Sequence, residues 1–155
     1  MYRRSEICNH IVENIKTIEK DIDLYTQSYR SVSRDPIDSV GCNKLAPGEA
    51  LVGVFDTGEE KSREMGSTRV RLTVVVEFYY RPKTGQSKSE ELNRILAELT
   101  RRVMVDYQQG GLALNTEEVA NELDIDGIYD KIINGSITFE ITYRHGLFDP
   151  TKALC

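Results

Sequence analysis

The residues of this chain that could carry chemistry are few and widely spaced. Its two histidines, His10 and His145, lie in neither an HExxH nor a CxxC…HxxxH spacing, so the sequence predicts no catalytic or structural zinc site. Asp124, Asp126 and Asp130 form the densest set of carboxylates, but their spacing differs from that of an EF-hand loop. We therefore expect solvated acidic side chains near a turn, with no metal and no cofactor.

Nucleophilic and phosphate-binding chemistry is equally unsupported. The three cysteines, Cys8, Cys42 and Cys155, are far apart and odd in number, which indicates reduced thiols rather than a disulfide framework. The pair Gly110-Gly111 is better explained as a helix stop than as a phosphate nest, and no glycine motif typical of nucleotide binding or of a nucleophile elbow is present. We expect no enzymatic activity.

The charge balance also limits the classes of partner. The chain has 20 basic and 25 acidic residues, a net charge of -5. A protein that grips duplex DNA needs a basic face to neutralise phosphates, which this balance disfavours. An acidic protein can still surround DNA and leave it free to slide, because like charges repel.

Two stretches of alternating residues define the elements that would position any site. Apolar residues alternate with others over residues 69–80 and again over residues 136–144, which predicts two long strands with one face on a core. A short apolar run at residues 50–55 predicts a strand paired with the first through a loop at residues 56–67. Residues 119–129 are ambiguous, and we assign them to a strand.

Two amphipathic helices complete the pattern. Isoleucines at helical spacing predict a first helix that frays from about Lys20; they are Ile7, Ile11, Ile15, Ile18 and Ile22. A second helix follows the capping-box spacing of Ser87 and Glu90 and ends before Gly110.

The predicted fold class is therefore α+β: a four-stranded, mainly antiparallel sheet with two helices on one face, in the order α-β-β-α-β-β. We expect a single domain over residues 1–155, with a long irregular segment at 25–49, in which a short extra strand could lie, and a C-terminal tail at 146–155. No apolar run is long enough to span a membrane, and the N-terminus does not resemble a signal peptide.

Four pieces of the sequence together resemble the tail terminator proteins of long-tailed phages, the lambda-type family. These are Pro-Gly-Glu-Ala-Leu-Val-Gly-Val-Phe at 47–55, the Gly-Glu-Glu loop at 58–60 that leads into the strand at 70–80, the Ser-Glu-Glu-Leu helix at 89–92 running to Arg102-Val103-Met104, and Ile-Thr-Phe-Glu-Ile-Thr-Tyr at 137–143. They span most of the chain.

The resemblance implies a structural virion protein assembled in the cytoplasm of the host bacterium. Such a protein forms a homohexameric ring that caps the tail tube, ends tail polymerisation and offers the surface that joins the head. Its partners would be itself, the tube protein and a head-tail connector protein, with DNA passing through the lumen without specific binding and no membrane involved. Two alternatives stay open: another connector or neck ring protein, and a small non-viral α+β ligand-binding module.

The resemblance transfers no individual residue, so candidate contact residues come from the hairpin and the tail. For all of them, packing within the chain or a mobile loop is the alternative interpretation. The candidate ring or tube interface comprises Asp56, Glu59, Glu60, Lys61, Arg63, Glu64, Arg69, Arg71, Val75 and Tyr79. Candidate anchors in the tail are Leu147, Phe148 and Leu154.

Overall fold

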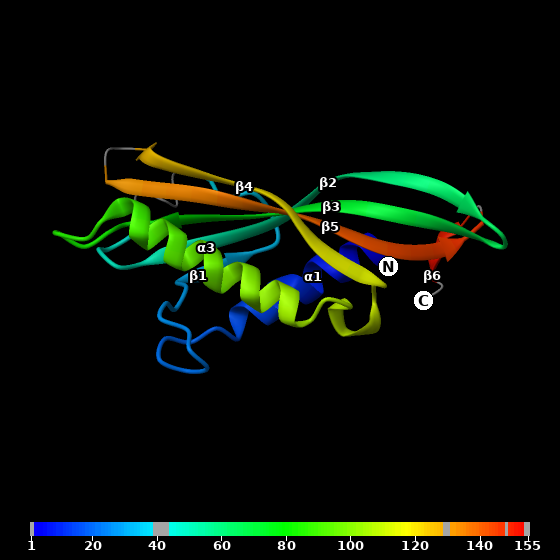
Figure 1. Ribbon diagram of the computed structural model, residues 1–155, viewed down its shortest axis with the longest axis horizontal. Coiled ribbons are helices and arrows are strands. Elements are labelled where there is room, and N and C mark those ends of the chain that lie inside the picture. Colours follow the sequence, from blue (N-terminus) through cyan, green and yellow to red (C-terminus); the bar gives the residue numbers. More distant parts are fainter. Residues whose placement is uncertain (1, 39–43, 129–130, 148, 154–155) are drawn as a thin grey trace.

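The computed structural model describes residues 2–38, 44–128, 131–147 and 149–153. This part of the chain has the predicted α+β class, with two helices on one side of a mixed sheet of six strands (Figure 1). The elements are α1 (Arg3–Lys16), β1 (Ser31–Ser33), β2 (Ala50–Glu64), β3 (Ser67–Tyr80), α3 (Lys88–Val105), the 3-10 turn η1 (Gln109–Gly111), β4 (Asn115–Ile128), β5 (Ile132–Gly146) and β6 (Asp149–Ala153).

The prediction of four strands is wrong, because two short strands flank the four long ones. The strand order is β1-β2-β3-β5-β4, and β6 pairs with β5. β1 lies within the segment predicted to be irregular and pairs in parallel with residues 51–53 of β2, while β6 lies within the predicted tail. Both are too short to show alternation in the sequence, and each exists because a long strand offers it an edge.

The core lies between the helices and one face of the sheet. Alternate residues of β3 and β5 are fully buried on this face, and the buried stripes of α1 and α3 pack against them. In α1 the stripe continues only as far as Ile18, because the helix ends at Lys16 and three residues with positive φ follow at Asp21, Asp23 and Leu24. Ile22, predicted to belong to the stripe, is exposed.

The hairpin of β2 and β3 differs most from its predicted form. Residues 56–64 were expected to form a loop, but they continue β2, and the ladder to β3 runs without a break from Gly58 to the turn at Met65 and Gly66. A β-bulge between Asp56 and Gly58 resets the register. Gly66 has φ 78°, a conformation that glycine adopts at little cost. Charged residues in this stretch obscured its strand character, although cross-strand pairs of opposite charge stabilise a ladder.

The segment before β2 covers one end of the outer face of the sheet. Ile37 and Leu45 pack with Leu51, Tyr79 and Ile132 in a second, smaller apolar cluster. The backbone N–H of Ile37 donates to the Glu77 carboxylate over 2.5 Å. Burial raises the pKa of Glu77, although this hydrogen bond opposes the shift. The long segment is therefore fastened to the sheet.

Candidate interaction surfaces

The base of the β2–β3 hairpin carries a cluster of ion pairs that joins α1, the segment after β1 and β2. Asp56 accepts from Arg4 Nε over 2.5 Å and from Arg34 Nη2 over 2.8 Å, and its side chain is only 16% exposed. Burial by itself would raise the pKa of Asp56, but the hydrogen bonds from Arg34 and Arg4 outweigh it and hold the pKa below its ordinary value.

Glu59 extends this cluster to β5. Its carboxylate lies 3.6 Å from Arg4 and accepts a hydrogen bond of 2.6 Å from the hydroxyl of Tyr143. Burial, together with this carboxylate, raises the pKa of the Tyr143 phenol. Asp56 and Glu59 were predicted to contact a partner. Their side chains instead form ion pairs and hydrogen bonds within the chain, so both stabilise the base of the hairpin.

Six other residues of the predicted interface lie on an arm, defined as residues 60–71 of β2, the turn and β3, whose tip projects past both helices (Figure 1). Charges of both signs alternate across the ladder: Glu60 pairs with Arg71 at 2.5 Å and Glu64 with Arg69 at 3.5 Å. Lys61 and Arg63 are exposed on the same arm. The structure therefore brings these six predicted residues together on one projecting hairpin.

The other predicted contact residues lie elsewhere. Val75 and Tyr79 are half-buried on the outer face of the sheet, and Tyr79 packs against the cluster around Leu45. Leu147 is half-buried beyond the end of β5, while Phe148 and Leu154 lie outside the described residues.

Met65, at the tip of the arm, was missed by the sequence interpretation. It is the most exposed of the large apolar side chains that the structure describes. Methionine is flexible and polarizable, which suits it to adaptable contacts. The signal that could have found it is an apolar residue directly before a turn glycine, at the end of a charged hairpin.

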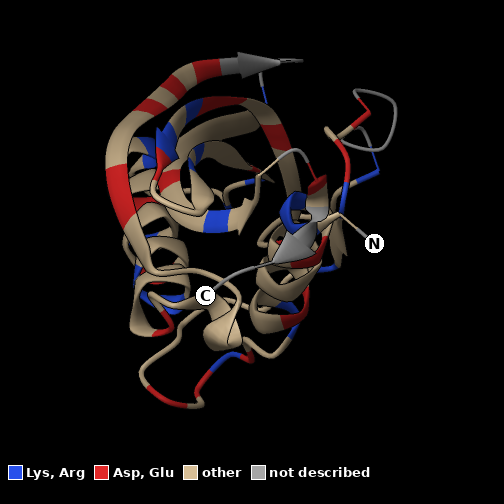
Figure 2. Ribbon diagram, turned by 90° about the vertical axis from the view of Figure 1, so that its right-hand side faces the viewer, with Lys and Arg blue, Asp and Glu red and all other residues tan. Residues whose placement is uncertain are grey.

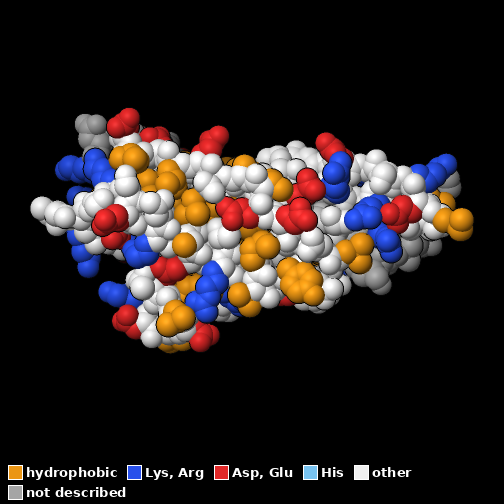
Figure 3. Space-filling model, viewed as in Figure 1, with side chains coloured by type: hydrophobic (Ala, Val, Ile, Leu, Met, Phe, Trp, Pro, Cys, Tyr) orange, Lys and Arg blue, Asp and Glu red, His pale blue; other side chains and the backbone are white. Residues whose placement is uncertain are grey.

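A second surface that the sequence interpretation missed is β4. Every residue from 117 to 126 is exposed, so neither face of this part of the strand is covered, and β4 ends the sheet with β5 as its neighbour. The strand contains five carboxylates and no basic residue. Figure 2 shows these acidic bands along the ribbon of β4, and Figure 3 shows acidic and apolar side chains over the same part of the surface. The exposed apolar residues are Val119, Leu123 and Ile125.

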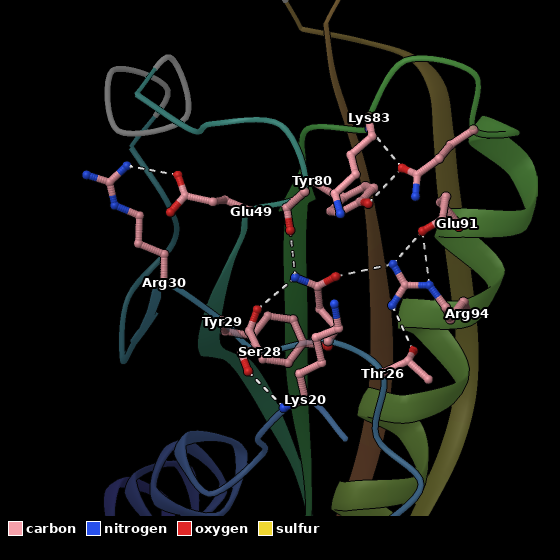
Figure 4. Close-up of a pocket in the computed structure, with 13 residues that line it drawn as sticks. Lys20, Thr26, Ser28, Tyr29, Arg30, Glu49, Tyr80, Lys83, Glu91 and Arg94 are labelled. Atoms are coloured by element: carbon pink, nitrogen blue, oxygen red, sulfur yellow. Dashed lines mark hydrogen bonds and ion pairs between the residues drawn. The ribbon is translucent and has the colours of Figure 1, made fainter. Parts of the chain in front are cut away.

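A polar cavity of about 430 Å³ lies between residues 26–30, the residues just before β2, the end of β3 and α3. Arg94 and Glu91 of α3 form an ion pair on one wall, and Arg30 and Glu49 form another on the opposite wall (Figure 4). Lys20 and Lys83 also line this cavity. We call it the cationic cavity.

The residues singled out for catalysis or metal binding are dispersed. His10 Nε2 lies 2.6 Å from Asp106, where α1 meets the end of α3, and His145 is buried at the end of β5. Burial raises the pKa of the Cys8 thiol to about 12. Asp124 and Asp126 are exposed on β4, Asp130 lies outside the described residues, and no group of three potential metal ligands occurs in the described part of the chain.

His10 and Asp106 form a structural contact between two helices. Burial alone would raise the pKa of Asp106, but hydrogen bonds from His10, the Gly110 N–H and Asn14 hold it below its ordinary value. These groups are already paired with one another, so the arrangement fastens α1 to the end of α3.

Three surfaces stand out in the part of the chain that the structure describes: the charged arm, the exposed acidic strand β4 and the cationic cavity. No described helix is long and apolar enough to cross a membrane. A comparison of the chain with models of protein families and with curated proteins finds no match.

Proposed function

We propose that this protein is a structural component of a phage virion, a ring that caps the tail tube, ends tail polymerisation and provides the surface that joins the head. The observation that carries the proposal is the arm, which projects past both helices and ends in the exposed Met65. An apolar residue held in solvent at the end of a hairpin, flanked by charges of both signs, suits docking on another protein.

The charge pattern of the arm supports a protein partner. Glu60 and Arg71 are both more than half exposed as side chains, so their ion pair contributes little to stability. Such charges can exchange partners on docking, where complementary patterns set the specificity and the rate of association. A nucleic acid would instead favour a single basic stripe.

Two unlike surfaces of the chain support assembly into a ring. β4 and the cationic cavity are different surfaces: β4 is an edge strand, whereas the cavity lies beside α3 where β3 ends. Contacts between unlike surfaces of identical subunits propagate head to tail and close into a ring when the rotation allows. A hexamer is the number that the sequence resemblance implies. The net charge of -5 suits a lumen through which DNA passes without being held.

Another neck or connector ring is the nearest alternative, because it would use surfaces of the same kind. A ligand-binding module is favoured by one observation, the cationic cavity. Small-molecule sites are predominantly apolar with few polar groups, whereas this cavity is lined mainly by polar and charged residues, including Lys20, Arg30, Glu49, Glu91 and Arg94. We therefore place this alternative second.

The test is negative-stain microscopy of the purified protein, alone and mixed with tail tubes, together with light-scattering mass over a range of concentrations. Rings with an open centre, or tubes capped at one end, are expected. A compact dimer that does not bind tubes would exclude the proposal and favour the ligand-binding module. Capping of the connector face of filled heads, without any binding to tubes, would favour a neck protein.

A shortened arm separates tube binding from folding. Residues 62–69 can be replaced by Asn-Gly, because Lys61 and Val70 are directly paired and a two-residue turn can join them. This variant should keep its circular dichroism spectrum and lose tube capping. Met65→Ala is the milder companion, expected to weaken capping without shifting thermal unfolding. A shortened variant that still caps tubes would show that the arm is not the tube contact.

A further inference from the structure

The cationic cavity has an excess of positive charge that the chain does not neutralise. Of its four basic residues, Arg94 is paired with Glu91, and Arg30 lies 3.5 Å from Glu49, which accounts for both carboxylates on its walls. Lys20 and Lys83 form no ion pair with the described residues, and both are exposed. The cavity therefore offers two uncompensated ammonium groups to a negatively charged partner.

Apolar side chains accompany these charges. Ile22 and Leu24 lie two and four residues after Lys20, separated by Asp21 and Asp23, and both are exposed. The carbonyl oxygen of Asp23 accepts a hydrogen bond from Arg101 of α3, which ties this loop to the helix beside the cavity. A partner that fits here presents carboxylates together with apolar groups.

β4 has the complementary composition. Its exposed part, residues 117–126, carries Glu117, Glu118, Glu122, Asp124 and Asp126 together with Val119, Leu123 and Ile125. An exposed strand edge invites another chain, and like charges prevent two copies of the same strand from pairing with each other. Two copies of β4 therefore repel each other, whereas a basic surface can approach the strand.

We propose that the exposed part of β4 in one copy of this chain docks on the cationic cavity of the next copy, with its carboxylates on Lys20 and Lys83. This inference rests on the proposed ring and names the contact that builds it. The occupant is a second copy because the same chain carries both complementary surfaces, and they are separate: β4 is an edge strand, whereas the cavity lies beside α3 where β3 ends. Every copy then uses one surface on each neighbour, as a head-to-tail ring requires.

Charge reversal tests the contact. The β4 variant is E118K/E122K and the cavity variant is K20E/K83E; the combined variant carries all four changes, and E13K/E90K changes the net charge by the same amount elsewhere. Self-association is measured by light scattering at low salt, and folding by circular dichroism. Each reversed pair should weaken self-association about tenfold or more, because like charges would face each other. The combined variant should recover most of the loss, and E13K/E90K should match the unmodified chain.

The outcomes separate this contact from the ring itself. Rings that form equally well with E118K/E122K would overturn the contact and leave the proposed ring standing. Failure of the combined variant to recover, with both single reversals folded, would also overturn it. An unmodified chain that stays monomeric in solution but caps tubes would overturn docking between free copies while supporting the terminator role. A chain that neither associates nor caps tubes would remove both proposals.

Discussion

Both edges of the sheet must be protected from unwanted pairing, because an edge strand exposes backbone groups that can pair with another chain. At the edge of β2, the structure covers the strand with β1, with the segment around Ile37 and Leu45, and with the ion pairs of Asp56. At the edge of β4, residues 117–126 lie bare on both faces and carry acidic side chains instead.

The difference shows which edge serves stability and which is available for contacts. Covering an edge buries apolar area and fixes a segment of chain, so it contributes to the free energy of unfolding. Protecting an edge with charge contributes little to stability but sets which partner can approach. Variants at the covered edge should therefore change the free energy of unfolding, whereas matched variants on β4 should leave it nearly unchanged.

The largest contrast is expected for apolar truncation. Leu45→Ala at the covered edge removes a side chain that is 1% exposed and should lower the free energy of unfolding by about 2–5 kcal/mol. Ile125→Ala on β4 removes one that is 44% exposed and should cost less than about 1 kcal/mol. Urea denaturation of both variants measures the difference. Equal losses would mean that β4 contributes to the core as much as the covered edge does.

The ion pairs at the covered edge should give the next largest effect. Asp56→Asn removes the charge that Arg4 and Arg34 share and should cost about 1.5–3 kcal/mol at neutral pH. Because the folded pKa of Asp56 is lowered, its contribution is present above the unfolded value near 3.8 and is lost as the pH falls through the folded pKa. The two proteins should therefore approach equal stability in acid.

Glu122→Gln on β4 is the matched control for Asp56→Asn. Glu122 is exposed, so this change should alter stability by no more than about 0.5 kcal/mol at neutral pH. Thermal unfolding followed by circular dichroism across the acid range measures both variants. A loss in Asp56→Asn that persists unchanged in acid would show that geometry, rather than charge, stabilises the cluster.

A smaller effect should follow from adding one methyl group at the covered edge. A Cβ on Gly53 would lie 2.8 Å from the carbonyl oxygen of Asp35 and 2.9 Å from a side-chain carbon of Ile37, so Gly53→Ala should push the covering segment outward at a cost of about 1–3 kcal/mol. Gly58→Ala, on the same strand with nothing within 4 Å, should change stability by less than about 1 kcal/mol. Denaturant midpoints compare them, and equal midpoints would mean that the segment yields freely.

Hydrogen exchange gives the finest contrast, because it reports on the edge without changing the sequence. In dilute protein, backbone amides of residues 117–126 that point away from β5 should exchange sooner than those of β3, which is paired on both sides. At concentrations where the protein assembles, these amides should gain protection if β4 is a contact. Mass spectrometry of peptides from both strands measures this, and unchanged exchange in β4 on assembly would exclude it from the interface.

Local sequence patterns predicted the elements whose own residues form the core. The alternation at residues 69–80 and 136–144 predicted β3 and β5, and the capping spacing at Ser87 predicted the start of α3, where Ser87 accepts from the Glu90 N–H. Strand continuation through residues 56–64 was missed because its charged residues pair across the ladder, and β1 and β6 were too short to show a period.

By itself, the sequence determined the α+β class, the long central strands and the grouping of mixed charges on one hairpin, because periodicity and composition are local properties. Only the tertiary structure decided that Asp56 and Glu59 serve the base of that hairpin while Glu60 and Arg71 remain exposed on the arm. It alone showed that β4 lies bare at an edge. Exposure and ion pairing depend on which distant residues meet, and Asp56 meets Arg4 across 52 positions of the chain.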